Sequence, residues 1–372
     1  MKIAFISFDF GEYSVRHASA LAEKAVVALF APEPLVTPYL DQLSPTVQLY
    51  LHRKPRLRHL HKQIVNMLNL VRQVKAFDPD VIHFQHGQPW FNLALPLLRR
   101  YPLVVTVHDP QPHAGDQESR TMPAWLMHFG YRQADQLIVH ARQVKEIVVN
   151  QLGFADARVH VVPHIALGDD SACPEVKEEP NTLLFFGRIW AYKGLDYLIR
   201  AEPLISAQIP ELKIVIAGTG EEMERYHKLM VHPERFEVHN EYIPDSAIPH
   251  YFRQSSIVVL PYVEATQSGV IPLAYTFARP VVATNVGGLP ELVEEGVTGL
   301  LVPPRDEKAL AQAILRLLQD RPLRTAMGTN GKQKLDNECS PKAIARKTLL
   351  VYQQAIGTFH EAGSKLQVAS SD

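Results

Sequence analysis

Short apolar runs alternate with longer helical patterns along almost the whole chain of 372 residues. In the first half the apolar runs are "KIAFISF", "AVVALF", "VQLYLH", "DVIHFQ", "LVVTVHD", "QLIVHA" and "VHVVPH", and in the second half "TLLFFG", "KIVIAG", "FEVHN", "SIVVLP", "PVVATN" and "GLLVPP". Strands that are apolar on both faces and separated by helices are typical of parallel sheets covered on each side. The pattern predicts an α/β protein with two doubly wound parallel-sheet domains.

The boundaries of these domains follow from changes in composition. Residues 166–181 are rich in acids, proline and small residues, which predicts a linker between domains at 1–165 and 182–340. The last helical pattern, 341–360, runs from about Pro341 to Phe359, and we expect the tail, 361–372, to be disordered. Ligands of such sheets bind at the carboxyl ends of the strands, so we expect the functional residues there, in a cleft between the domains.

Composition excludes several classes of protein. The net charge of -1 gives no basis for coating nucleic acid, and the two cysteines, Cys173 and Cys339, fit a reducing compartment rather than a disulfide framework. The apolar run after Lys2 is too short for a signal peptide, and no run approaches the roughly 20 apolar residues that span a bilayer. We therefore expect a soluble cytoplasmic protein.

One loop carries two cations where a diphosphate could bind. In "FFGRIWAYKG", Gly187 and Arg188 follow a strand, and Lys193 precedes an amphipathic helix. Arg188 could form bidentate bonds to phosphate, and Lys193 could act as a mobile point charge. The alternative is two solvated cations on a loop. The order of a Walker loop is absent.

A glycine pair, Gly218 and Gly220, follows another strand in "IVIAGTGEEME". A third glycine of the dinucleotide fingerprint is missing, and the turn after the first strand has only Gly11, so a nicotinamide enzyme is disfavoured. The pair either permits close approach of the backbone to a base or ribose, or makes a tight turn.

Glu264 lies in "LPYVEATQSGVIPLAY", residues 260–275, where a strand ends, a glycine-bearing loop follows and a helix begins. Such a place commonly binds an anion. A carboxylate has the wrong sign for that role, so Glu264 must serve another purpose.

Together these stretches resemble glycosyltransferase family 4, whose members have the GT-B fold. The resemblance is carried by "TVHD" (106–109), "VPH" (162–164), "FGRIWAYKG" (186–194), "IAGTGEE" (216–222), "PYVEATQSGVIPLAY" (261–275) and "PVVATNVGGLPELVEEGVTGLLVPPRD" (280–306). It implies two Rossmann-like domains, an acceptor-binding N-terminal one and a C-terminal one for a nucleotide-sugar donor. It also implies that the last helix packs back on the N-terminal domain.

The resemblance implies a role for each site residue in the second half. Arg188 and Lys193 would grip the diphosphate, with no protein-bound metal and no cofactor, because no D-x-D pair is placed for a metal. Glu264 would accept hydrogen bonds from hydroxyls of the transferred sugar, rather than cap the following helix. The remaining donor-binding residues would be Gly187, Gly218, Gly220, Gln267, Ser268, Gly269 and Val270.

Pro272 departs from the family pattern. The family has a second carboxylate eight residues after the first, where it holds the nucleotide ribose, and this chain has Pro272 there. Proline is tolerated in the first turn of a helix, whose N–H groups have no helical partner. The ribose contact is left unassigned, and a protein of low activity remains an alternative.

In the first half the resemblance places His108 beside the donor sugar and Gly11 in a loop that closes over the diphosphate. A buried structural histidine is the alternative for His108. Asp109, which follows it, could cap a helix or contact substrate.

Seventeen histidines suggest a metal site as a further hypothesis. The closest groups are His59 with His61, His83 with His86, and His160 with His164. None has a cysteine or carboxylate at a zinc spacing, and H-E-x-x-H is absent, so we predict no metal site.

Residues 53–75 combine cations with an apolar stripe. The cations are Arg53, Lys54, Arg56, Arg58 and Lys62, and the stripe consists of Leu57, Leu60, Ile64, Leu68 and Val71. One interpretation is a domain helix that buries this stripe and solvates its cations. The other is contact with an anionic membrane or with a lipid-linked acceptor.

The sequence thus predicts a GT-B glycosyltransferase, independent of metal, that moves a hexosyl group from a nucleotide-diphosphate sugar to a hydroxyl of a saccharide or lipid-linked acceptor. By resemblance the anomeric configuration is retained, and the product is a glycan, polysaccharide or glycolipid. The alternatives are a GT-B sugar epimerase or phosphorylase, and a non-catalytic nucleotide-sugar-binding subunit.

Overall fold

The computed structural model describes residues 1–52, 60–85, 88–108, 110, 123–168 and 175–369. The chain divides into two compact units. The first unit contains Met1–Pro112, Glu118–Ile165 and Ser340–Asp372, and the second contains His113–Gln117 and Ala166–Cys339.

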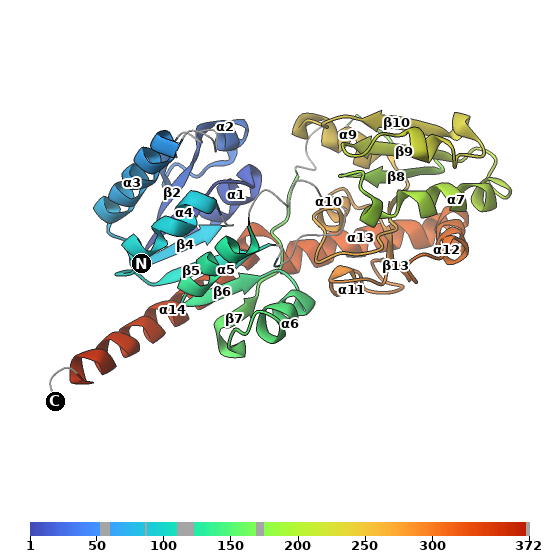
Figure 1. Ribbon diagram of the computed structural model, residues 1–372. Coiled ribbons are helices and arrows are strands. Elements are labelled where there is room, and N and C mark those ends of the chain that lie inside the picture. Colours follow the sequence, from blue (N-terminus) through green and yellow to red (C-terminus); the bar gives the residue numbers. More distant parts are fainter. Residues whose placement is uncertain (53–59, 86–87, 109, 111–122, 169–174, 370–372) are drawn as a thin grey trace. The chain divides into compact units, whose positions relative to one another are not determined.

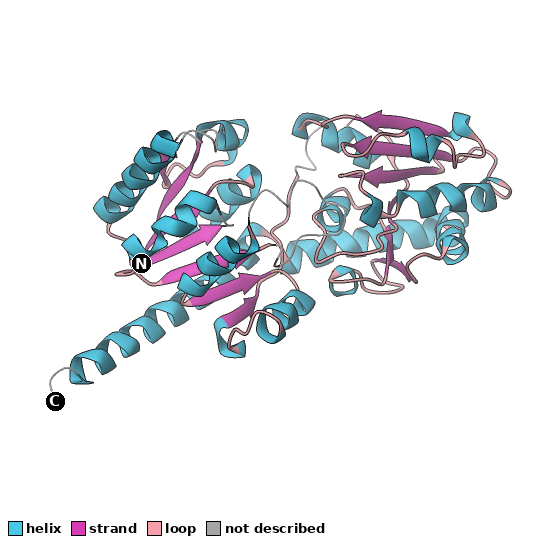
Figure 2. Ribbon diagram, viewed as in Figure 1, coloured by secondary structure: helices cyan, strands magenta, loops and turns pink. Residues whose placement is uncertain are grey.

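The first unit is built on a parallel sheet with the strand order β3-β2-β1-β4-β5-β6-β7 (Figures 1 and 2). The strands are β1 Lys2–Ser7, β2 Val26–Pro32, β3 Gln48–His52, β4 Val81–Gln85, β5 Leu103–Val107, β6 Gln136–Val139 and β7 Val159–Val161. The register pairs Ser7 with Gln85 and Gln85 with Thr106. The carboxyl ends of β1, β4 and β5 therefore lie together at one edge.

Helices cover both faces of this sheet. They are α1 Gly11–Ala22, α2 Glu33–Val36, α3 Leu60–Phe77, α4 Pro89–Ala94, α5 Ala124–Gln133, α6 Arg142–Asn150 and α14 Pro341–Ala369, with 3-10 turns η1 Thr37–Gln42, η2 Leu95–Leu98 and η4 Asp156–Arg158. Ile82 and Phe84 share a core with residues of α3, α4 and α5. His83, which points to the other face, contacts α14.

The second unit repeats the plan with the strand order β10-β9-β8-β11-β12-β13. Its strands are β8 Thr182–Phe186, β9 Lys213–Gly218, β10 Phe236–Asn240, β11 Ile257–Leu260, β12 Val281–Thr284 and β13 Gly299–Val302. Its helices are α7 Leu195–Ser206, α8 Glu224–His227, α9 Ile248–Gln254, α10 Val270–Thr276, α11 Leu289–Leu292, α12 Glu307–Gln319 and α13 Arg321–Glu338, with η5 Ala191–Lys193, η6 Pro233–Arg235 and η7 Asp245–Ala247.

The predicted α/β class with two doubly wound parallel sheets is confirmed. Every apolar run named in the sequence contains a strand of the structure, and every described strand pair is parallel. The buried residues of these strands are mostly Val, Ile, Leu and Phe, which fits sheets covered on both sides.

The predicted C-terminal tail was wrong in part. Helix α14 continues past Phe359 to Ala369, although the sequence after Phe359 was expected to be disordered. Gly363 alone costs a helix only about 1 kcal/mol relative to alanine, and its neighbours Glu361, Ala362, Lys365 and Leu366 favour helix.

The segment 166–181, predicted as a linker, belongs to the second unit in its described parts. The carboxylate of Glu178 lies 3.1 Å from Arg279 Nη1 and 3.0 Å from Arg324 Nη2, and it accepts a hydrogen bond of 2.7 Å from Ser256 Oγ. Burial by itself raises the pKa of Glu178, but the Ser256 hydrogen bond and the two arginine charges bring it below its usual value. Glu178 is thus half-buried among these partners, whereas Glu175 and Glu179 are exposed.

Helix α3 buries a stripe that overlaps the predicted one only at Val71. Its buried apolar side chains are Met67, Leu70, Val71, Val74 and Phe77, whereas Ile64 and Leu68 are exposed. The centres of the two stripes lie about a quarter of a turn apart. Arg53, Lys54, Arg56, Leu57 and Arg58 lie outside the described residues.

Buried histidines attach α14 to the first unit. His17 Nε2 is 3.1 Å from Thr348 Oγ1, and His83 lies between Tyr352 Oη at 2.6 Å and Thr106 Oγ1 at 2.7 Å. Burial lowers the pKa of His17 to about 3 and holds the pKa of His83 well below its usual value. Both rings are therefore neutral in the folded protein.

No helix in the described part of the chain is long and apolar enough to cross a bilayer.

The neutral histidines predict that the first unit loses stability in acid. Below about pH 6.5 the unfolded chain protonates His17, while the folded chain does not. The free energy of unfolding therefore falls by about 1.4 kcal/mol per pH unit below that pH because of this one group. We expect His17→Gln to reduce this slope by about one proton in denaturant unfolding measured between about pH 7.5 and about pH 5.

The exposed Asn69 provides a control, since Asn69→Gln changes no titratable group and should leave the pH slope of stability unchanged. Equal slopes for the His17 variant and the wild type would show that His17 is not neutral in the folded state.

Candidate functional site

Arg188 lies at the point where the strand order of the second sheet reverses. It follows Gly187 at the carboxyl end of β8, which is flanked by β9 on one side and β11 on the other. Doubly wound sheets bind ligands at such a switch point. The predicted residues of the second half follow β8, β9 and β11, so their loops meet at this place.

Gly218 and Gly220 allow the loops after β8 and β9 to pack against each other. A Cβ on Gly218 would lie 1.8 Å from the carbonyl oxygen of Gly187, and one on Gly220 would lie 2.1 Å from that of Ile189. The Ile189 N–H donates to the Thr219 carbonyl over 2.9 Å. The close packing of these two loops therefore requires glycine at both positions, without any need for a bound ligand.

Lys193 lies over an aromatic ring that the sequence analysis did not single out. Its Nζ is 3.7 Å from the ring centroid of Tyr262, which follows β11 and is buried. The Val263 N–H donates to the Tyr192 carbonyl over 2.8 Å, so the loops after β8 and β11 are joined beside this ring. The ammonium group is held by a cation–π contact.

Arg188 and Ser268 lie near the hydroxyl of the same tyrosine. Burial raises the pKa of Tyr262, while the Ser268 side chain and the charge of Arg188 oppose that rise. The buried hydroxyl itself has no hydrogen-bond partner among the described residues. The alternative of two cations that are merely solvated is disfavoured, since Arg188 and Lys193 are both partly buried.

Glu264 is exposed on the loop that Tyr262 begins. Ala265, the next residue, packs closely against Gly287. A Cβ on Gly287, whose φ is +56°, would lie 1.5 Å from the Ala265 carbonyl oxygen. The loop is thus fixed between the loops that follow β8 and β12. Helix α10 has Gly269 at its N-cap and no side-chain cap, so Glu264 does not cap it.

The residues before α10 face the β8 loop. Ser268 Oγ accepts a hydrogen bond of 3.2 Å from the Val270 N–H, and a Cβ on Gly187 would lie 3.7 Å from Val270 Cγ2. Gln267 Oε1 is buried and has no hydrogen-bond partner in the described part of the chain. Pro272 is the third residue of α10, where its missing N–H breaks no helical bond.

His108 lies in the first unit, immediately after β5, and is almost fully buried. Its Nε2 is 2.7 Å from the amide nitrogen of Gln85, and its ring stacks on Phe10 with centroids 4.2 Å apart. Phe10 adopts a φ of 62°, which a bulky residue rarely does. The contacts with Gln85 and Phe10 fix the position of the ring.

Gly11 begins α1, where a Cβ would lie 2.0 Å from the Leu35 carbonyl oxygen. This residue lets α1 approach α2 closely, a packing role that the sequence did not reveal. His86 and Asp109 lie outside the described residues.

Among the residues that the structure describes, no three His, Cys, Asp or Glu side chains are placed to hold a metal ion. His160 bonds to Gln136 over 2.8 Å, and His164 to the Ile165 carbonyl over 2.9 Å. Both thus have protein partners.

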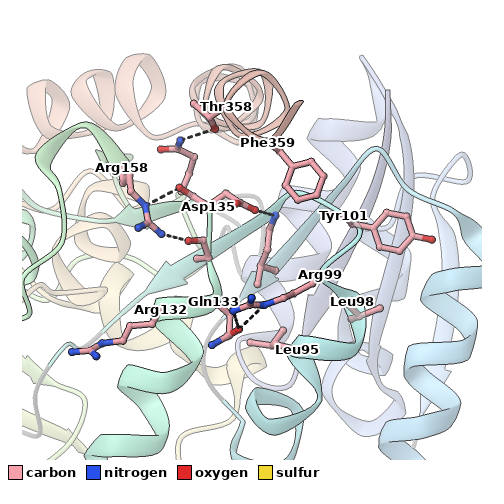
Figure 3. A pocket seen from close by; sticks show the side chains of 13 residues that line it. Leu95, Leu98, Arg99, Tyr101, Arg132, Gln133, Asp135, Arg158, Thr358 and Phe359 are labelled. Atoms are coloured by element: carbon pink, nitrogen blue, oxygen red, sulfur yellow. Dashed lines mark hydrogen bonds between the residues drawn. The ribbon is translucent and has the colours of Figure 1, made fainter. Parts of the chain in front are cut away.

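A cavity of about 500 Å³ lies at the other end of the first sheet (Figure 3). It opens beside Leu103 and Gln136, the first residues of β5 and β6, and Phe359 of α14 forms part of its wall. Arg158 donates to the Asp135 carbonyl over 3.1 Å, and Arg99 donates to Gln133 Oε1 over 2.8 Å. His108 lies at the opposite edge, so this cavity is separate from the candidate site.

Two family models match the chain, one in each half. Residues 11–165 match "Glycosyltransferase Family 4", and residues 180–320 match "Glycosyl transferases group 1". The chain belongs to this glycosyltransferase family.

Curated relatives of this glycosyltransferase carry several names. Glycogen synthase of Mycobacterium tuberculosis is 27% identical over 303 residues, which cover 76% of this chain and 70% of that protein. D-inositol 3-phosphate glycosyltransferase of Kribbella flavida is 29% identical over 332 residues, which cover 80% of this chain and 78% of that protein.

Solved structures share the fold of this glycosyltransferase. Sucrose-phosphate synthase from Thermosynechococcus elongatus aligns with a TM-score of 0.71 at 20% identity, over 96% of this chain and 100% of that one. HepE of Anabaena in complex with UDP aligns with a TM-score of 0.71 at 18% identity, over 95% of this chain and 100% of that one. The predicted GT-B fold is thereby confirmed.

Two glycines of the loops at the candidate site provide a matched pair for testing its packing. Neither has a positive φ, but a Cβ on Gly220 meets the Ile189 carbonyl, whereas a Cβ on Gly269 meets nothing within 4 Å. We expect Gly220→Ala to lower the free energy of unfolding by about 1–3 kcal/mol, as overpacking does, and Gly269→Ala to leave it nearly unchanged. Denaturant unfolding measures both, and equal losses would contradict the described loop packing.

Proposed function

We propose that this glycosyltransferase takes a hexosyl group from a nucleotide-diphosphate sugar and that its second unit binds this donor. The observation that carries the proposal is the arrangement around Tyr262. The Lys193 ammonium lies 3.7 Å from its ring centroid, and Arg188 and Ser268 lie near its hydroxyl, which has no hydrogen-bond partner in the described part of the chain. Two cations are thus positioned at the switch point of a doubly wound sheet, where a diphosphate would lie.

These cations suit the departure of a nucleoside diphosphate. As the bond between the anomeric carbon and the diphosphate oxygen breaks, the bonding electrons stay on the diphosphate and its negative charge grows. A new bond forms between the acceptor oxygen and the same carbon, and the acceptor proton passes to the released phosphate. Cations positioned beforehand stabilise the transition state, with about 3–4 kcal/mol for each strong donor.

Retention requires that the acceptor attack from the face that the diphosphate leaves. From the family resemblance we infer a front-face displacement without a protein nucleophile. Neither this mechanism nor the diphosphate contacts require a protein-bound metal or a cofactor.

Glu264 is proposed to accept hydrogen bonds from the hydroxyls of the sugar. Its loop is joined at Val263 to the loop that carries Lys193, so the carboxylate stays close to the proposed diphosphate site. A hydrogen bond to a charged acceptor contributes about 1.5–3 kcal/mol. The buried Gln267 Oε1, which lacks a hydrogen-bond partner among the described residues, is a second acceptor for this donor.

His108 is proposed to act from the first unit, where its backbone carbonyl and ring would address the sugar. Gln85 and Phe10 hold the ring in place. A ring N–H held in this way can donate a hydrogen bond to a sugar oxygen.

The solved neighbours favour a uridine nucleotide as the first donor to test. HepE of Anabaena has been solved with UDP and with UDP-glucose. The name of the Kribbella relative, D-inositol 3-phosphate glycosyltransferase, points to a hydroxyl acceptor that is a small polar molecule. A saccharide or a lipid-linked sugar offers the same chemistry.

A second candidate function is a non-catalytic nucleotide-sugar-binding subunit. Pro272, which is buried in α10, favours it because this position lacks the carboxylate that the family resemblance implies. Such a subunit would bind the donor without turning it over.

Binding and turnover together separate these functions. We expect UDP, GDP or ADP to raise the melting temperature of the wild type by mass action, and Lys193→Gln to abolish that rise. Glu264→Gln should keep the rise but slow donor turnover by about 10- to 100-fold, because it removes a charged acceptor. Lys308→Gln, which replaces an exposed cation on α12, is the matched control.

Equal donor hydrolysis by the wild type and Glu264→Gln would favour the binding subunit. An unchanged nucleotide shift in Lys193→Gln would overturn the proposed diphosphate site. Release of a free nucleoside diphosphate with transfer to an acceptor would exclude an epimerase or phosphorylase.

A further inference from the structure

One helical layer of the first unit contains no acidic residue. Helices α3, α4 and α5 and the turn η2 lie on one face of the sheet, with α3 and α5 each packing against α4 (Figure 1). Their sequences include no Asp or Glu, although the chain has 39 acidic residues among 372. A solvated helical surface normally mixes both signs of charge.

The outer surface of this layer exposes large apolar side chains. Ile64, Val65 and Leu68 of α3 are 51%, 56% and 42% exposed, and Trp125 of α5 is 65% exposed. Leu93 of α4 and Leu97 of η2 are exposed as well. The inner surface of α3 already packs into the core, so these residues form a second apolar face directed outward.

Cations accompany these apolar residues. Lys62, Arg72 and Lys75 are exposed on α3, and Arg132 is exposed on α5. On the α3 helical wheel, Arg72 and Lys75 fall on the same face as Ile64 and Leu68. Arg100, which follows η2, forms an ion pair of 2.8 Å with Asp78, so its charge does not add to those of the layer.

We propose that the outer surface of α3, α4, η2 and α5 binds the surface of an anionic lipid bilayer. A helix with apolar residues and cations on one exposed face lies in the membrane interface, with its apolar side chains among the acyl chains and its cations at the headgroups. Tryptophan suits that boundary as well, because one end of its ring is apolar and the other is polar. This inference goes beyond the proposed sugar transfer and does not depend on it.

Charge complementarity favours a bilayer over a second copy of the chain. In a two-fold dimer the same patch would face itself, so the cations of α3 would meet like charges. A lipid surface instead provides anionic groups for the cations and an apolar phase for Ile64, Val65 and Leu68. The layer is also spread over three helices, which suits a broad surface rather than a groove.

Sedimentation of the full-length protein with vesicles tests the proposal. We expect binding to vesicles of phosphatidylcholine with phosphatidylglycerol, little binding to phosphatidylcholine alone, and release at high salt. Each cation near an anionic surface contributes about fivefold, so replacing Lys62, Arg72 and Lys75 by Gln should weaken partitioning by about a hundredfold.

A second variant tests the apolar contribution separately. Replacing Ile64, Val65 and Leu68 by Gln should weaken partitioning by about tenfold or more. The matched control replaces Leu204, Val231 and Tyr242, which are exposed apolar residues of the second unit, by Gln, and should bind as the wild type does. Thermal melts report whether each variant is folded.

Failure to bind anionic vesicles at low salt, or equal binding to neutral vesicles, would overturn the proposal. So would a concentration-dependent dimer of the wild type that the Ile64, Val65 and Leu68 variant loses, since a second copy would then cover this face. The readout needs no sugar donor, so its failure is distinguishable from failure of the proposed function.

Discussion

The contact of the Lys193 ammonium with the buried ring of Tyr262 is the interaction on which the candidate site depends. A lysine on an exposed loop would spread over many rotamers and would bring little organised charge to a ligand. The ring removes much of that freedom, and the hydrogen bond between Val263 and Tyr192 holds the two loops at the distance that the contact needs. Arg188 and Ser268 lie near the hydroxyl of the same ring. One buried side chain thereby gathers residues from both sides of the β8–β11 switch point.

The glycines of these loops allow the same close packing. Gly218, Gly220 and Gly287 each face a backbone carbonyl of a neighbouring loop at a distance that no side chain could occupy. They permit the loops after β8, β9, β11 and β12 to pack as one assembly. In the first unit, buried histidines are part of the corresponding support, since His17 and His83 bond to α14 and His108 bonds to Gln85.

The sequence was sufficient to predict the strands, because buried strands depend on a local pattern. Apolar runs such as "SIVVLP" specify buried strands, and the resemblance to glycosyltransferases identified Arg188, Lys193 and Glu264 as candidates. Tyr262 was missed because a cation–π contact leaves no spacing signal in the sequence. Gln85 was missed for a similar reason, since only the pairing of β4 with β5 brings it to His108. The burial of Glu178 and the face that α3 buries also depend on tertiary packing, which overrides composition and periodicity.

The most direct test of this account is a crystal structure of the protein with the nucleoside diphosphate that stabilises it most. The account predicts diphosphate oxygens within hydrogen-bonding distance of Arg188 and Lys193, at about 2.7–3.2 Å, with Tyr262 still beneath the ammonium group. A diphosphate bound away from the β8 and β11 loops, with both cations directed into solvent, would contradict it.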